Sequence, residues 1–183
     1  IRAHRLVVLI HGGIFSADTW KWVGTLDHLA VAGMSVVALD LERYQGPFAS
    51  QALRSRLLKD FLAAIGFQAA PKSLIIVSAS MGGTVAMPYC LDASLSATVA
   101  GYVSVSALGL PSVSSSRGGG MVDDEGGNPN AVAPLTSIPA LLLWGALDHP
   151  DSAKERAHEF FFPSHQLVVI PDAPHPAYLK DPQ

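Results

Sequence analysis

The sequence is poor in cysteine and in charge, and each shortage excludes a class of protein. A single cysteine, Cys90, among 183 residues leaves no internal disulfide framework and no cysteine cluster for zinc. It fits the cytoplasm or another reducing compartment, organelles included. Only 15% of the residues are charged, the net charge is −3, and no basic cluster occurs. The chain therefore lacks the electrostatic footprint of a protein that binds nucleic acid or an anionic membrane.

Long apolar runs and ligand-binding motifs are also missing. No apolar run approaches the roughly 18 residues that a transmembrane helix needs, so we expect no membrane span. No cluster of metal-ligand residues and no phosphate-binding glycine loop occurs, so we expect neither a metal nor a nucleotide cofactor. Nothing ahead of Leu6 resembles a signal peptide, and Gln183 follows His175 too closely for a closing helix. We therefore expect one domain over 1–183 whose edge elements are missing at both ends.

The chain is 49% hydrophobic, and its apolar runs alternate with helical patterns. The runs predict strands at 6–10, 34–41, 74–77, 99–105, 140–144 and 167–170. Helices are predicted over 53–65, around 152–162, and in a stretch that contains Trp20, Trp22, Leu26 and Leu29, starts at Ser16 or Asp18 and ends at Gly33. Such alternation predicts an α/β fold with a mostly parallel sheet and helices on both faces. The Gly/Ser-rich segment 112–130 is predicted to be a flexible loop.

A sharp turn is predicted between the strand at 74–77 and a helix that starts at Thr84. Ser80 stands at the apex of this turn, and small residues lie at Ser78, Gly82 and Gly83, where the strand and helix backbones crowd together. This is the pattern of a nucleophile elbow, G-x-S-x-G, with Ser78 in place of the first glycine. Ser80 is therefore the candidate nucleophile.

Partners for such a serine follow two later strands. A serine hydroxyl is a weak nucleophile until a base takes its proton, and that base needs a third group to orient it. Asp148 follows the strand at 140–144, and His175 follows the strand at 167–170. Functional groups of α/β folds gather at the carboxyl ends of the strands, so we predict that Ser80, His175 and Asp148 meet as nucleophile, base and orienting acid.

A developing oxyanion also needs hydrogen-bond donors. The backbone amide of Met81, just past the nucleophile, and that of Gly13, in the loop after the first strand, are the candidates. His11, which opens that loop, is expected to order it rather than to transfer protons. Asp151 competes with Asp148 for the acid's role, although capping of the helix around 152–162 is its alternative role.

Several motifs along the chain occur together in one known family. They are His11-Gly12, Phe15-Ser16, Thr19-Trp20, Gly24-Thr25-Leu26, Leu29-Ala30, Ala32-Gly33, Ala38-Leu39-Asp40-Leu41, Ser78-Ala79-Ser80 with Pro88, Trp144-Gly145 with Asp148, and His175-Pro176 with Tyr178-Leu179. With these motifs the chain resembles the α/β-hydrolases, and among them the small lidless proteins of the alpha/beta-hydrolase domain fourteen type, also called CIB. Residues 42–45 and the segment 112–130 depart from that pattern.

The resemblance implies an α/β-hydrolase fold and hydrolysis of small acyl esters, with Ser80, Asp148 and His175 as nucleophile, acid and base. It also implies a capacity to move acetyl groups from lysine to coenzyme A. We therefore expect a serine hydrolase or acyltransferase whose small-molecule substrate is an acyl ester, a thioester or an acyl-amide. The alternative is a non-catalytic subunit of a larger assembly that keeps the fold, because fold alone does not dictate activity.

Overall fold

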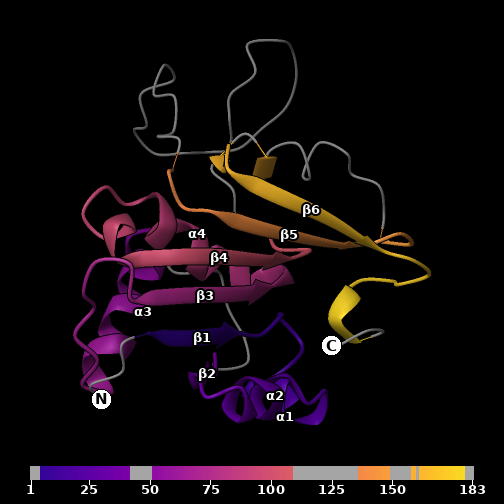
Figure 1. Cartoon of the computed structure of the whole chain (residues 1–183), viewed down its shortest axis with the longest axis horizontal. Helices are drawn as coiled ribbons and strands as arrows, with labels where there is room; N and C mark the ends of the chain where they lie inside the picture. Colours follow the sequence, from indigo (N-terminus) through magenta and orange to yellow (C-terminus); the bar gives the residue numbers. More distant parts are fainter. Residues whose placement is uncertain (1–4, 42–50, 109–135, 149–157, 160, 180–183) are drawn as a thin grey trace.

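The computed structural model describes residues 5–41, 51–108, 136–148, 158–159 and 161–179. Six strands form one sheet: β1 (Leu6–Ile10), β2 (Ser35–Leu39), β3 (Leu74–Ala79), β4 (Val99–Val105), β5 (Ala140–Gly145) and β6 (His165–Ile170). Their order is β2-β1-β3-β4-β5-β6, and every neighbouring pair is parallel (Figure 1). All six predicted strands are confirmed, with ends that shift by a few residues.

The described helices are α1 (Ala17–Trp22), α2 (Thr25–Val31), α3 (Gln51–Ala64) and α4 (Gly83–Leu91), with 3₁₀ turns η1 (Ser80–Gly82), η2 (Ser96–Thr98) and η3 (Ala177–Leu179). The prediction of one helix containing both Trp20 and Leu29 was wrong. Gly24 adopts a left-handed conformation at φ 80°, which ends α1 and caps the start of α2. The predicted flexible loop at 112–130 and most of the predicted helix around 152–162 lie outside the described residues.

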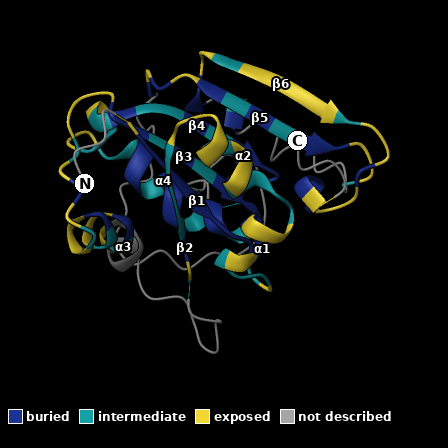
Figure 2. Cartoon of the chain, turned by 60° about the horizontal axis from the view of Figure 1, so that its bottom comes forward, coloured by how far each residue is buried: buried dark blue, intermediate teal, exposed yellow. Residues whose placement is uncertain are grey.

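The sheet has an apolar core on each face, because alternate residues of a strand point to opposite sides. Val8, Ile10, Leu74 and Ile76 pack on one face with residues of α3 and α4. Val7 and Leu9 pack on the other face with Trp20 of α1 and with Tyr178 of η3. The predicted arrangement of helices on both faces of a parallel sheet is thus confirmed. Figure 2 shows the central strands largely buried and the edge strand β6 largely exposed.

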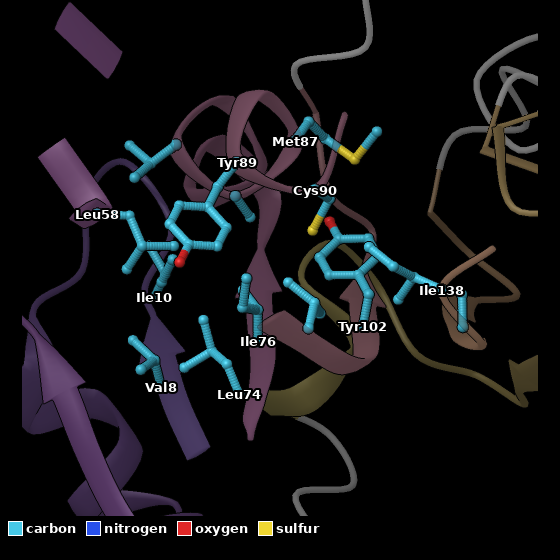
Figure 3. Close-up of a cluster of buried hydrophobic side chains, with 14 of the residues drawn as sticks. Val8, Ile10, Leu58, Leu74, Ile76, Met87, Tyr89, Cys90, Tyr102 and Ile138 are labelled. Carbon is cyan, nitrogen blue, oxygen red and sulfur yellow. The ribbon is translucent and has the colours of Figure 1, made fainter. Parts of the chain in front are cut away.

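The single cysteine lies inside the α4 face of the core. Cys90 is completely buried, and Figure 3 shows its sulfur beside the ring of Tyr102. Burial raises the pKa of the Cys90 thiol, because the charged thiolate loses its hydration. The thiol therefore stays protonated at neutral pH and acts as a small apolar group.

We expect Cys90 to resist alkylation in the native protein. Reaction needs a thiolate that the reagent can reach, and only unfolding supplies one. Since native proteins keep roughly 10⁻³ or less of their molecules unfolded, iodoacetamide should react at least about 10³-fold more slowly with native than with guanidinium-unfolded protein. Mass spectrometry of the time course measures both rates, and comparable rates would contradict this burial.

Candidate active site

Ser80 lies at the junction between β3 and the helical segment that leads into α4. Its φ of 46° places it in the left-handed region, which side chains other than glycine seldom adopt. The N–H of Leu108, which follows the end of the neighbouring strand β4, donates to the Ser80 carbonyl at 2.8 Å. This hydrogen bond stabilises the turn. A non-glycine residue kept in a strained conformation is typical of functional sites, because the surrounding structure must enforce it.

The glycines after Ser80 are required by close packing. A Cβ on Gly82 would lie 2.7 Å from the carbonyl oxygens of Ile10 and His11. A Cβ on Gly83 would collide with the Leu108 carbonyl oxygen, although both glycines have ordinary helical φ values. The predicted crowding of backbones at the elbow is therefore confirmed.

The elbow departs from the common motif at Ser78, and the structure gives this serine a partner. The Ser78 hydroxyl lies 2.8 Å from the Tyr102 hydroxyl of β4, and both groups are fully or almost fully buried. A buried hydroxyl without a hydrogen bond would cost free energy, so the Tyr102 hydroxyl makes a serine tolerable where a glycine is usual.

The three side chains predicted to meet form one hydrogen-bonded chain. The Oγ of Ser80 lies 2.8 Å from Nε2 of His175, and Nδ1 of His175 lies 2.8 Å from Oδ2 of Asp148. An ionised Asp148 only accepts, so Nδ1 carries the proton and Nε2 offers its lone pair to the Ser80 hydroxyl. Ser80, Asp148 and His175 lie beyond the ends of β3, β5 and β6, and their catalytic roles stay a prediction.

Backbone hydrogen bonds fix the loops that carry Asp148 and His175 relative to each other. Beyond the ends of β5 and β6, the Ala146 N–H donates to Ile170 O and the Leu147 N–H to Ala173 O, each at 2.9 Å. The Asp148 N–H turns back to Gly145 O at 3.0 Å. A Cβ on Gly145 would collide with the Ala173 carbonyl, so only glycine lets these two loops approach so closely.

The three side chains differ in their contact with solvent. Ser80 is 8% exposed and the Asp148 side chain 11%, whereas the His175 side chain is 41% exposed. Solvent therefore reaches His175 directly, whereas Asp148 is largely shielded from it. The alternative acid, Asp151, lies outside the described residues.

The loop after β1 lies against the elbow. A Cβ on Gly12 would lie 3.3 Å from the Cβ of Ser80, and a Cβ on Gly13 would collide with the Met81 side chain. The two residues whose amides are the candidate oxyanion donors, Gly13 and Met81, are thus neighbours beside Ser80. The absence of side chains at Gly12 and Gly13 is what brings this backbone so close to the elbow.

His11 orders this loop through its ring. The Leu41 N–H lies 2.9 Å from Nε2, which must therefore be unprotonated to accept it, and Nδ1–H then donates to Gly12 O at 2.6 Å. Oδ1 of Asp40 also lies 3.2 Å from Nε2, but its side chain is 67% exposed and water can pair it. We therefore assign the proton to Nδ1, in keeping with the expected structural role of His11.

Ser106 is a residue that sequence reasoning missed. It follows β4 at φ 48°, it is fully buried, and its hydroxyl has no hydrogen-bond partner among the described residues. Its N–H donates to Leu143 O at 2.9 Å. Serine rarely adopts left-handed backbone angles, so its presence in the sequence does not indicate a left-handed φ at this position.

Other features of the described part of the chain lie apart from this site. A hollow of about 500 Å³, lined in part by Gly101, Leu141 and Gln166, lies at the starts of the strands, whereas the site is at their carboxyl ends. Within the described ranges, no group of three or more His, Cys, Asp or Glu side chains could hold a metal ion. No described helix is long and apolar enough to cross a membrane.

Comparison with known proteins agrees with the fold and with the family resemblance. The chain is 29% identical over 182 residues to Protein ABHD14A of Danio rerio, covering 97% of this chain and 60% of that protein. It is 29% identical over 179 residues to the putative protein-lysine deacylase ABHD14B of Rattus norvegicus, covering 96% of this chain and 77% of that one. The chain therefore spans less than two thirds of the length of the Danio rerio protein.

Solved structures show the same architecture. A predicted CIB-like hydrolase from Thermoplasma acidophilum superposes with a TM-score of 0.70 at 21% identity, covering 99% of this chain and 82% of that one. The carboxylesterase CesB of Bacillus subtilis gives 0.69 at 17% identity, with coverages of 100% and 81%. The sequence model of the alpha/beta hydrolase family matches residues 7–134, which include the elbow and the Gly12–Gly13 loop. The chain belongs to the alpha/beta hydrolase family.

Proposed function

We propose that this chain is a serine hydrolase or acyltransferase that acts on small acyl esters, thioesters or acyl-amides. The observation that carries the proposal is the hydrogen-bonded chain from Asp148 through His175 to Ser80, with 2.8 Å at each contact. This geometry meets the requirement that a nucleophile and its base lie within hydrogen-bond reach while a third group orients the base.

In the acylation step, the Ser80 oxygen attacks the substrate carbonyl carbon while Nε2 of His175 takes the hydroxyl proton. Asp148 stabilises the imidazolium that forms. When the tetrahedral intermediate collapses, the bond to the leaving alcohol, thiol or amine breaks and His175 returns the proton to that group. The acyl group then remains on Ser80 as an ester.

In the deacylation step, water attacks the acyl carbon and gives its proton to His175, which then protonates Ser80 as the acid leaves. The thiol of coenzyme A could replace water, which would make the reaction an acyl transfer. The name of the Rattus norvegicus relative supports an acylated lysine among the substrates. The 41% exposure of His175 supports an acceptor that enters from solvent.

Two backbone amides, those of Met81 and Gly13, stabilise the negative charge on the substrate oxygen by hydrogen bonds. Support comes from the close approach of Gly12 to Ser80 and of Gly13 to Met81. Backbone donors fixed in this way need no reorganisation during the reaction, and each is worth about 10²- to 10³-fold in rate.

Two exposed apolar residues adjoin residues of the site in the sequence, and they support a neutral acyl group. Ile14, next to Gly13, is 84% exposed, and Leu147, next to Asp148, is 65% exposed. Neither carries a charge that would attract an ionic substrate. This composition agrees with the weak net charge of the whole chain.

Labelling with a fluorophosphonate tests the proposal. We expect one covalent adduct, mapped by mass spectrometry to Ser80, because only an activated serine attacks this probe readily. Ser80→Ala should abolish the adduct, whereas Ser94→Ala, a matched change at an exposed serine, should keep it. A folded, full-length protein that carries no adduct would contradict the proposal and favour the non-catalytic subunit.

A further inference from the structure

Three aromatic side chains link two loops of the candidate site that follow different strands. One is the Gly12–Gly13 loop after β1, and the other is the loop after β6 that carries His175. The ring of Tyr178 stacks on Trp20, with centroids 4.7 Å apart and an interplanar angle of 21°. Phe15 meets the ring of Tyr178 edge-on at 6.2 Å and 71°. We call Phe15, Trp20 and Tyr178 the aromatic bridge. These centroid distances are typical of favourable aromatic pairs.

One end of the aromatic bridge is attached to the proposed oxyanion loop. The Phe15 N–H donates to Gly12 O at 3.2 Å, and the Phe15 ring lies 3.3 Å from where a Cβ of Gly12 would stand. Trp20, 1% exposed, belongs to α1, which directly follows that loop. A displacement of Phe15 or Trp20 would therefore displace the backbone beside Ser80.

The other end of the aromatic bridge is attached to the loop that carries His175. Tyr178 lies in η3, in which the Leu179 N–H donates to Pro176 O at 3.2 Å. Figure 1 shows the chain leaving β6 and returning as η3 toward the middle of the sheet. The Tyr178 ring thus anchors a short segment whose His175 side chain is itself 41% exposed.

The ring rather than the hydroxyl of Tyr178 makes these contacts. Tyr178 is 5% exposed, and its hydroxyl has no hydrogen-bond partner among the described residues. Burial raises the pKa of Tyr178 to about 12, so the hydroxyl stays neutral. A phenylalanine would keep the stacking and would remove an unpaired buried polar group.

We propose that Tyr178 is a positioning residue, whose ring holds the His175 loop in register with the oxyanion loop so that Nε2 stays at the Ser80 hydroxyl. This inference rests on the proposed function for its effect on rate. Misplacement of a reacting group by about 1 Å can cost about 10²-fold in rate. The ring acts through the loop that carries His175.

The test compares Tyr178→Ala and Tyr178→Phe with Phe67→Ala, which removes a buried aromatic ring packed with α3 on the other core. With an aryl acetate, at a temperature where circular dichroism shows each variant folded, Tyr178→Ala should lower kcat about 10²-fold with KM nearly unchanged. Tyr178→Phe should match the native chain, and Phe67→Ala should lose thermal stability but keep kcat. Native kcat in Tyr178→Ala, or an equal loss of kcat in Phe67→Ala, would overturn the proposal. If Tyr178→Ala does not fold, Tyr178→Leu replaces it, with the same expectation and the same result against it.

A second readout separates this inference from the proposed function. The Nδ1–H of His175 donates to Asp148 and should give a downfield proton resonance, identified by its loss in His175→Gln. We expect this resonance at the same chemical shift in the native chain and in Tyr178→Phe, but at a changed shift in folded Tyr178→Ala, because the imidazole would keep Asp148 and lose the Ser80 hydroxyl at Nε2. This expectation holds whether or not the protein turns over an ester. A native chain that shows the resonance but no adduct on Ser80 would refute the function alone. A resonance whose chemical shift is unchanged in Tyr178→Ala would refute the positioning role alone.

Discussion

Replacing Ser80 with alanine should lower kcat on an aryl ester by about 10⁴- to 10⁶-fold while the protein remains folded. The hydroxyl within 2.8 Å of Nε2 of His175 would be the only nucleophile of the proposed mechanism, so its loss removes the covalent step. Water attack aided by the oxyanion donors would leave a small residual rate. Steady-state kinetics beside a thermal melt measures this effect.

Ser80→Gly separates chemistry from conformation in this experiment. Both variants lack the hydroxyl and should be equally inactive. Alanine retains the strain of a left-handed φ of 46°, whereas glycine relieves it, so the glycine variant should be the more stable by about 1–2 kcal/mol. Turnover that persists in both variants would assign the reaction to another residue.

Replacing Gly83 with alanine should destabilise the fold by about 3 kcal/mol, near the upper end for overpacking a core. The new methyl would overlap the Leu108 carbonyl and lie 2.9 Å from the Ala107 Cβ, so backbone rather than a flexible side chain has to move. For a chain of this size each kcal/mol lowers Tm by about 2–4 °C, which predicts a fall of roughly 6–12 °C. Thermal unfolding followed by circular dichroism measures it.

Gly101→Ala is the matched control for this substitution. At Gly101 the nearest atom to an added Cβ is Pro139 O at 3.7 Å, an ordinary contact, so its effect on the free energy of unfolding should stay within about 0.5 kcal/mol. Equal Tm values for Gly83→Ala and Gly101→Ala would mean that the backbone at the elbow can move apart without a loss of stability. Because Leu108 also donates to Ser80 O, Gly83→Ala should reduce Ser80 labelling as well.

The elbow and the strands could be predicted because their constraints are local in the sequence. Strands buried on both faces need continuous apolar runs, and 74–77 and 140–144 are such runs. The need for small residues after Ser80 is equally local, since the helix begins where the strand ends. Because the sheet is parallel, the ends of three strands lie at the same edge, so the sequence could place Ser80, Asp148 and His175 near one another. The distances of their hydrogen bonds could not be predicted in this way.

The features that sequence reasoning missed depend on contacts or angles that no local pattern encodes. Apolar spacing continued through Gly24, so periodicity gave one helix where a left-handed glycine makes two. The stacking of Trp20 on Tyr178 joins α1 to η3 near the far end of the chain, and neither residue's neighbours in sequence indicate the other. The partner of Ser78 is likewise a residue of the next strand.

The length of chain between Ser80 and His175 has a consequence for folding kinetics. The hydrogen bond between them joins residues 95 positions apart, and strands β4, β5 and β6 must all pair before it can form. Closing contacts of such long range is slow, because the entropy of the intervening loop is lost before the contact compensates for it. In refolding, the reactivity of Ser80 should therefore return only after helix and early strand signals. A reactive serine would mark molecules whose sheet is complete as far as β6.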